Sequence, residues 1–322
     1  MLAILTLVAA IGASPKPGEL KSFEDWSIGC DNGRACMAVS LMEMESGENQ
    51  LTLQISRAPG GDAPAQLRIP NIEEDVAGAP VTLALETGAV VLRTALPEPG
   101  VSLTLTADPS FLSALRKGRR VQLRTTDNQV LGSASLRGLS DALAYMEAQQ
   151  GAVTRPPALP TISVPRPPRP ATMALSATDV QSLQARIGCD AGDAPLPTEA
   201  VKLDSRNWLA LVACNSSPYN FVTAPVLISG KGKSRKMKPA EFDFGAGLSP
   251  IEGVPLVSNA NWDPLQGELS SFTKGRGLGD CGSAETYVWD GRRFRLTAQF
   301  AMAECRGVLD WIPTWRANVV RR

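Results

Sequence analysis

The amino-acid sequence predicts a mainly β protein of two β-rich domains, the first sandwich-like, with a few short helices and a Pro-rich linker. Its 322 residues suit about two domains. Short runs of alternating apolar and polar residues recur along the chain, which is the pattern of half-buried strands. The stretch RPPALPTISVPRPPRPA lies in the expected linker, residues 151–172, and holds seven prolines. We expect it to form an extended, solvated spacer.

The first domain is expected at residues 20–150. Its strand-like runs, separated by Gly and Pro, are QLTLQIS, PVTLALE, AVVLRTA, VSLTLTA and RVQLRTT. Two helices are predicted among them. The stretch DPSFLSALRKG has an Asp108 cap and a Gly118 stop, and LSDALAYMEAQQG has a Ser140 cap and ends at Gly151.

The second domain is expected at residues 173–322. It opens with LSATDVQSLQARIGC, in which Ser176 and Asp179 match a capping box before a helix with one apolar face. The strand-like runs that follow are NWLALVAC, NFVTAPVLIS, SSFTKG and ETYVWDGRRFRLTAQF. In the last of them, Asp290 and Gly291 predict a hairpin turn.

Residues 1–19 are expected to be a signal peptide and leader. The segment MLAILTLVAAIGAS is an apolar run about thirteen residues long, whereas a membrane span takes about 20. It matches the apolar region of a secretory signal, with Ala10 or Ala13 at the cleavage site, although no basic residue precedes Lys16. A buried N-terminal strand is the alternative. No later segment is long and apolar enough to span a membrane. A cleaved secretory signal would make this a periplasmic or secreted protein.

The six cysteines form three neighbouring pairs along the chain. In an exported protein they predict disulfide bonds, although fifteen pairings are formally possible for six cysteines. Zinc binding is the alternative, but neither a C-x-x-C spacing nor a histidine supports it, and no metal site is expected. The local pairing, which keeps each bond within one supersecondary unit, is Cys30–Cys36, Cys189–Cys214 and Cys281–Cys305.

The absence of histidine and the balanced charge exclude several classes of function. Without histidine the chain cannot form a Ser-His-Asp or Cys-His catalytic set or use imidazole in acid–base catalysis. The formal net charge is zero, whereas nucleic-acid-binding proteins usually carry a strong basic excess. We therefore expect no nucleic-acid partner and no cofactor.

The stretch KGRGLGDCG contains the letters of a G-x-G-x-x-G nucleotide loop. Such a loop needs a strand before it and a helix after it, but a strand-like run follows here. We therefore predict a glycine-permitted turn that directs Cys281 towards Cys305, with Arg276 and Asp280 paired locally. The alternative is a recognition loop that binds a ligand through Lys274, Arg276 and Asp280.

The basic segment GKGKSRKMKP places five cations between residues 231 and 238. It lies between two strand-like runs, so we expect a hairpin loop. The simplest interpretation is that its basic side chains are solvated at the tip of the loop. The functional alternative is a site for an anionic partner, such as a phosphate-bearing glycolipid or acidic peptidoglycan groups. The candidate ligand-binding residues of this segment are Lys231, Lys233, Arg235 and Lys236.

Most of the six tryptophans lie in the expected second domain. Exposed rings would indicate a sugar-binding or docking surface, whereas core positions are the common alternative in a disulfide-bonded β domain. The stretch DWIPTW supplies the two candidate docking residues, Trp311 and Trp315.

Two sequence blocks carry a resemblance to a known family. FEDWSIGCDNGRACMA and FTKGRGLGDCGSAETYVWDGRRFRL, with the later ECRG and WRA, resemble the bacterial secreted family called domain of unknown function 1176, over nearly the whole mature chain. Residues 20–150 also resemble the invasion-associated locus B proteins, through the F-x-D-W-x-x-x-C start, the close Cys30 and Cys36, and LSALRKGRRVQL with ASLRGLSDAL. The locus B resemblance implies a periplasmic or envelope role without established catalysis. The chain departs from those proteins by its second domain and by lacking their second cysteine pair.

The sequence therefore predicts a non-enzymatic exported protein that binds an envelope protein or a glycan. The alternative is a carboxylate-based hydrolase of envelope polysaccharide, because two acids flank the scissile bond in glycoside hydrolases. A third hypothesis is an inhibitor or sensor that docks on a partner enzyme through the basic loop or the tryptophans. The sequence does not give the oligomeric state. Candidate acid pairs for the hydrolase are Glu241 with Asp243 and Asp263 with Glu268.

Overall fold

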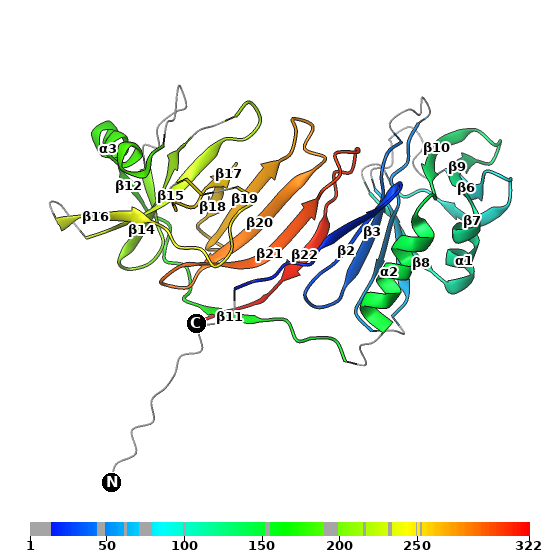
Figure 1. The fold of residues 1–322 in the computed structure, drawn as a ribbon, viewed down its shortest axis with the longest axis horizontal. Coiled ribbons are helices and arrows are strands. Elements are labelled where there is room, and N and C mark those ends of the chain that lie inside the picture. Colours follow the sequence, from blue (N-terminus) through cyan, green and yellow to red (C-terminus); the bar gives the residue numbers. More distant parts are fainter. Residues whose placement is uncertain are drawn as a thin grey trace, which may run out of the picture.

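The mainly β fold is confirmed by a computed structural model (Figure 1). Within the described part of the chain, the strands form five sheets, and three helices accompany them. The apolar part of the expected signal peptide, residues 1–13, lies outside the description. The described residues are 14–43, 49–60, 63–70, 79–98, 101–151, 155–189, 199–214, 217–230, 234–248, 250–251 and 253–322.

Two antiparallel sheets in the N-terminal part enclose one apolar core, which includes Trp26, Leu67 and Leu83. Strands of the first sheet, in the order β1-β2-β3-β4-β5-β8, are Leu20–Phe23, Trp26–Cys30, Cys36–Ser40, Gln54–Arg57, Ala65–Ile69 and Leu103–Ala107. Strands of the second, in the order β10-β9-β6-β7, are Val130–Ser135, Arg120–Thr125, Pro80–Leu85 and Val90–Ala95. We call these the N-terminal sheets.

The two helices of this part differ in how they begin. Helix α1 (Pro109–Lys117) starts at the predicted cap, where the Asp108 carboxylate accepts a hydrogen bond from the Phe111 N–H. Helix α2 (Leu139–Gly151) starts one residue before Ser140, so the predicted Ser140 cap is wrong. Gly138 precedes it at φ 86°, and a Cβ there would lie 1.8 Å from the Phe23 carbonyl oxygen. A glycine turn against β1, rather than a serine cap, sets the start of this helix.

Two further sheets, which we call the C-terminal sheets, hold most of the remaining strands. Strands of one, in the order β12-β13-β14-β15-β16 with β17 also paired to β15, are Thr172–Ala174, Glu199–Lys202, Asn207–Ala213, Val222–Ser229, Lys236–Pro239 and Val257–Ser258. Strands of the other, in the order β18-β19-β20-β21-β22, are Asn261–Asp263, Glu268–Lys274, Gly282–Trp289, Phe294–Met302 and Ile312–Arg316. The predicted hairpin at Asp290 and Gly291 joins β20 to β21.

Helix α3 (Ala177–Ile187) has the predicted capping box between Ser176 and Asp179. Its apolar side chains pack on the sheet that contains β14 and β15. The 3.6-residue period of the sequence therefore gave the correct buried face.

The Pro-rich segment departs from a wholly solvated spacer. Its proline-free centre forms β11 (Thr161–Val164), which pairs in parallel with β23 (Asn318–Arg321) at the C-terminus. Ile162 and Val164 are buried against Val288. The prolines on either side stop the strand at both ends, because proline cannot donate a ladder hydrogen bond.

All six cysteines are in disulfide bonds, in the local pairing that the sequence favoured. The zinc alternative is therefore wrong for these cysteines. Disulfides of this kind form and persist in oxidising compartments, so they indicate an extracellular or periplasmic protein. No helix in the described residues has the length and apolarity to span a membrane.

The N-terminal and C-terminal sheets pack directly against each other, with β22 beside β2 (Figure 1). Val39 and Leu41 from the first sheet share one apolar cluster with Met302, Trp311 and Ile312. The proline-rich segment is therefore not the sole connection between these two parts of the chain.

Candidate functional site

The KGRGLGDCG stretch forms the predicted turn between β19 and β20. Gly282 starts β20 at φ 136°, where a Cβ would lie 1.9 Å from the Thr273 carbonyl oxygen, so glycine is required there. Asp280 is fully buried and accepts hydrogen bonds from Arg276, with Nε at 2.7 Å from Oδ1, and from the Gly307 N–H at 2.7 Å. The predicted Arg276–Asp280 pair is thus confirmed.

These hydrogen bonds determine the charge state of Asp280. The Arg276 guanidinium, together with the Gly307 N–H, outweighs burial and lowers the pKa of Asp280 to about 2. The carboxylate is therefore ionised at neutral pH and fully engaged by its two partners. Lys274 lies nearby with its ammonium 5.9 Å from the Phe272 ring. The ligand-binding role suggested for Lys274, Arg276 and Asp280 stays a prediction. The observed contacts of Arg276 and Asp280 hold the turn together.

The segment after Cys305 connects this turn to the N-terminal sheets. Arg306 donates to the Asp25 carboxylate at 2.7 Å and to the Met42 carbonyl at 2.9 Å. Asp310 pairs with Arg68 at 2.5 Å. Burial alone would raise the pKa of Asp25, but hydrogen bonds from Arg306 and Ser135 and nearby arginine charges lower it. The segment is thus bonded to Asp280 of the turn through Gly307 and to the N-terminal sheets through Arg306 and Asp310. We call this segment, residues 306–310, the clamp.

The two candidate docking tryptophans are not freely exposed. Trp311 is buried and stacks on Phe272 with ring centroids 4.7 Å apart. Trp315 is half-buried, and its Nε1 donates to the Leu296 carbonyl at 3.2 Å. Their positions follow from the packing of β22 between two parts of the chain, which no local pattern in DWIPTW encodes.

The basic segment is a loop only in part. Lys231 and Lys233 lie outside the described residues, while Lys236 already belongs to strand β16 and Arg235 directly precedes it. Met237 is paired with Ile228 of β15, and Lys236 with Ser229. Because side chains alternate along a strand, Arg235 shares the face of Met237 and Lys236 faces the other way. The expected cation cluster is therefore divided between two faces of the sheet.

Arg235 contributes to a groove between α3 and β16, which we call the α3–β16 groove. One end is a cavity of about 300 Å³ with polar and charged walls, and the adjoining end is an apolar cavity of about 110 Å³. Residues at the charged end are Asp179, Ser182, Leu183, Arg186, Arg235 and Met237. Residues at the apolar end are Leu183, Arg186, Ile187, Val226, Met237, Lys238, Pro239 and Val254.

The two arginines of the groove have hydrogen-bond donors to spare. Arg235 makes a 3.5 Å ion pair with Asp179 and a 3.8 Å contact with the Met173 sulfur, a weak acceptor, and its buried Nε has no partner. Arg186 is exposed and makes no ion pair within the described chain. A guanidinium carries five N–H donors, so the charged end of the groove can accept an anionic group.

The sequence analysis identified Arg235 but missed Arg186. A usable signal existed, because Asp179, Ser182 and Arg186 recur at the three- and four-residue spacing of one helix face. What the sequence could not show is that this face lies beside the same side of β16 as Arg235.

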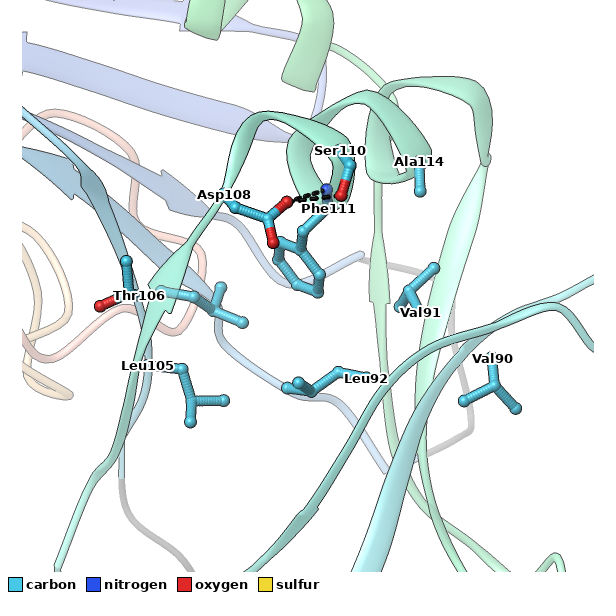
Figure 2. Close-up of a pocket in the computed structure, with 10 residues that line it drawn as sticks. Val90, Val91, Leu92, Leu105, Thr106, Asp108, Ser110, Phe111 and Ala114 are labelled. Atoms are coloured by element: carbon cyan, nitrogen blue, oxygen red, sulfur yellow. Dashed lines mark hydrogen bonds between the residues drawn. The ribbon is translucent and has the colours of Figure 1, made fainter. Parts of the chain in front are cut away.

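A second cavity, of about 250 Å³, lies between the last strands of the two N-terminal sheets, β7 and β8. Figure 2 shows Val91, Leu92, Leu105 and Phe111 directed towards this space, with Asp108 at its rim. Hydrogen bonds from the Ser110 hydroxyl and the Phe111 N–H lower the pKa of Asp108. Apolar and polar groups thus share the lining of the cavity, and its acid serves as the cap of α1.

A hollow of about 630 Å³ lies on the other side of Asp108, near α1 and α2. Its charged residues already have partners: Arg116 pairs with Glu147 at 2.5 Å, and Arg57 donates to Gln150. Arg116 of this hollow is thus paired with an acid, whereas Arg186 of the α3–β16 groove makes no ion pair within the described chain.

The acids proposed for hydrolysis are held by local partners. Glu241 pairs with Lys238 at 3.2 Å, and Asp243 pairs with Arg295 at 2.6 Å. Asp263 accepts backbone hydrogen bonds from the turn that follows it. Glu268 lies 3.4 Å from Arg321. Each of the four acids thus has a local ion-pair or hydrogen-bond partner in the observed fold.

Comparison with known proteins gives one curated relative and one solved structure. The chain is 26% identical over 339 residues to the uncharacterized protein YpfG of Escherichia coli (strain K12), with 92% of each chain covered. The crystal structure of invasion associated protein B from Bartonella henselae shares 18% identity, with 41% of this chain and 99% of that chain covered and a TM-score of 0.34. A structural match this distant says nothing about function.

The family model described as "Protein of unknown function (DUF1176)" matches residues 20–318. This match includes both sequence blocks that suggested the resemblance. The chain therefore belongs to that family.

Proposed function

We propose that this protein is a non-catalytic binding protein of the bacterial cell envelope, and that its α3–β16 groove binds an anionic envelope component. The observation that carries the proposal is the pair of arginines, Arg186 and Arg235, at the charged end of a groove with an apolar floor. The three disulfides support a site of action outside the cytoplasm.

The chemistry of arginine favours an oxyanion as the group recognised. Its planar guanidinium binds carboxylate or phosphate through two parallel N–H donors, and such charge-assisted hydrogen bonds are about twice as strong as neutral ones. An incoming oxyanion would use the donors that Arg235 does not spend on Asp179, 3.5 Å away. The neighbouring Asp179 repels an anion and so limits the affinity. The attraction between the two arginines and the anion is screened by salt, so binding should weaken as the ionic strength rises.

A binding role also agrees with the state of the candidate acids. Glu241 and Asp243 are each paired with a basic side chain. A glycoside hydrolase needs a proton donor and a second carboxylate free to act on the sugar. The observed pairs favour structural roles for these acids, which is why we propose binding rather than hydrolysis.

The test is direct binding by the disulfide-bonded full-length mature protein. The probes are polygalacturonate as an acidic glycan, vesicles of anionic phospholipid, and an acidic peptide, each titrated calorimetrically at low and physiological salt. We expect at least one probe to bind with salt-dependent affinity, and the Arg186→Gln/Arg235→Gln double variant to bind it at least tenfold more weakly. A Lys117→Gln variant, which removes an exposed cation from α1, is the matched control. Failure of every probe, or equal binding by the double variant, would contradict the proposal.

A further inference from the structure

The polar groups of the α3–β16 groove follow a fixed order along helix α3. Asp179 lies in the first turn of the helix and Arg186 in the last turn, seven positions later by number, which is about 10 Å along a helix axis. Arg186 lines both the charged and the apolar cavity, so it marks the junction between them. The groove therefore presents an acid, then a base, then an apolar space, with Arg235 of the opposite wall 3.5 Å from the acid.

The Asp179 carboxylate has one oxygen available to a ligand. Its Oδ2 accepts a hydrogen bond from the Ser176 N–H at 3.4 Å and makes the ion pair with Arg235. Within the part of the chain that the structure describes, its Oδ1 has no hydrogen-bond partner. An oxyanion without a donor would be repelled by this acid. A ligand that carries an N–H beside its oxyanion would instead use both the acid and the arginines.

The apolar cavity limits the size of the group that can enter it. Its volume is about 110 Å³, and Leu183, Ile187, Val226 and Val254 in its lining are buried. Lys238 also lines it, but its ammonium is already paired with Glu241 at 3.2 Å. A dry apolar cavity of roughly 150 Å³ holds one benzene molecule. The smaller space here therefore suits the aliphatic side chain of an amino acid, whereas a long acyl chain would exceed it.

We infer that the α3–β16 groove binds the carboxyl-terminal end of a peptide or protein whose last residue has an aliphatic side chain. This inference rests on the proposed function and specifies the class of the anionic component. The terminal carboxylate would contact Arg186 and Arg235, and the amide N–H of the last residue would donate to Oδ1 of Asp179. The side chain would enter the apolar cavity. One α-carbon carries all three groups, which matches the acid, base and apolar space that the groove places side by side.

The charges of the groove favour a peptide end over other small anions and over free amino acids. A phosphate or a sugar carboxylate has no aliphatic chain for the apolar cavity. A free amino acid has the aliphatic chain, but its ammonium cancels the charge of its carboxylate. The charged end holds two arginines against one aspartate, and such a site favours a ligand of net negative charge. A peptide end with a neutral amide and one carboxylate meets this condition, and capture of a terminal carboxylate is a recurring mode of peptide recognition.

The experiment uses N-acetylated tripeptides that differ from one another by a single group. The reference is acetyl-Ala-Ala-Leu with a free carboxyl end. Its three relatives carry a carboxamide in place of the carboxylate, glycine in place of leucine, or a methyl group on the leucine nitrogen. Dissociation constants for the full-length disulfide-bonded mature protein are measured by NMR titration at low salt. Free leucine is titrated in the same way.

We expect the reference tripeptide to bind, and each of its three relatives to bind at least tenfold more weakly. The carboxamide and the N-methylated form each lose a charge-assisted hydrogen bond, which corresponds to roughly tenfold in affinity. The glycine form leaves the apolar cavity unfilled. Arg186→Gln should weaken binding of the reference at least tenfold and reduce its advantage over the carboxamide, while Lys117→Gln should change neither. Circular dichroism of both variants verifies that they are folded.

Equal affinity for the reference and any one of its relatives would remove the corresponding contact and overturn the inference. Tighter binding of free leucine than of the reference would also overturn it, since the site would then recognise the free amino acid. If polygalacturonate or anionic vesicles bind in an Arg186-dependent way and the tripeptide does not, this inference fails and the proposed function stands. If no anionic probe binds, both fail. Because the decisive contrasts lie between ligands on the unaltered protein, they do not depend on how a variant folds.

Discussion

The buried Asp280 carboxylate gives the sharpest test of how the turn and the clamp are held together. Its pKa is lowered from 3.8 to about 2, and each pKa unit corresponds to about 1.36 kcal/mol. The shift of nearly two units therefore corresponds to about 2.4 kcal/mol at neutral pH. Arg276 is half exposed, with 48% of its side-chain surface accessible, so solvent screening makes this an upper value. We expect Asp280→Asn to lower the free energy of unfolding by about 2 kcal/mol at pH 7.

The pH dependence of this effect has a definite sign. The folded-state pKa of Asp280 lies below its unfolded value, so the ionised carboxylate stabilises the fold above about pH 4, and this contribution is lost as pH falls towards 2. The difference between wild type and Asp280→Asn should therefore shrink between pH 4 and pH 2. Urea denaturation with intact disulfides measures it at each pH. A loss below about 0.5 kcal/mol at pH 7, or a difference constant down to pH 2, would refute the assignment.

Three further changes test other parts of the fold by urea denaturation at neutral pH. Arg306→Ala removes the cation 2.7 Å from the buried Asp25 and leaves Arg137 at 3.7 Å, so it should cost about 2 kcal/mol; a cost below about 0.5 kcal/mol would argue against the clamp. Glu285→Gln should stabilise by about 1 kcal/mol. Burial raises the pKa of Glu285, so the fold favours its protonated form and loses stability as pH rises, and a gain that persists at pH 3 would contradict this reasoning. Replacing Cys189 and Cys214 by Ser opens a bond of sequence separation 25 and should cost about 3 kcal/mol; an unchanged midpoint would contradict that value.

Features with short sequence separation could be predicted from the sequence. The Asp108 cap depends on an N–H three residues away, and the capping box of α3 on Ser176 and Asp179. The Arg276–Asp280 pair spans four residues. In each case the partners are brought together by one turn of backbone, so no knowledge of the remaining chain is needed. The Ser140 cap failed because a distant contact of Gly138 with β1 determined the turn.

The candidate site depended on contacts that no local pattern contains. Arg186 and Arg235 are 49 positions apart by their numbers, and they share a groove only because α3 packs on one face of the sheet beside β16. The same holds for Trp311, which is buried where β22 meets the N-terminal sheets.

The sequence by itself determined the strand periodicity, two of the three helix starts and the turn that positions Cys281, because backbone geometry links residues a few positions apart. Tertiary structure alone decided which side of β16 carries Arg235, how β11 joins β23, and how the two sets of sheets meet. All three features depend on which apolar faces pack against each other. The alternation of residues along a strand shows which face is apolar, but it does not show which other element covers that face.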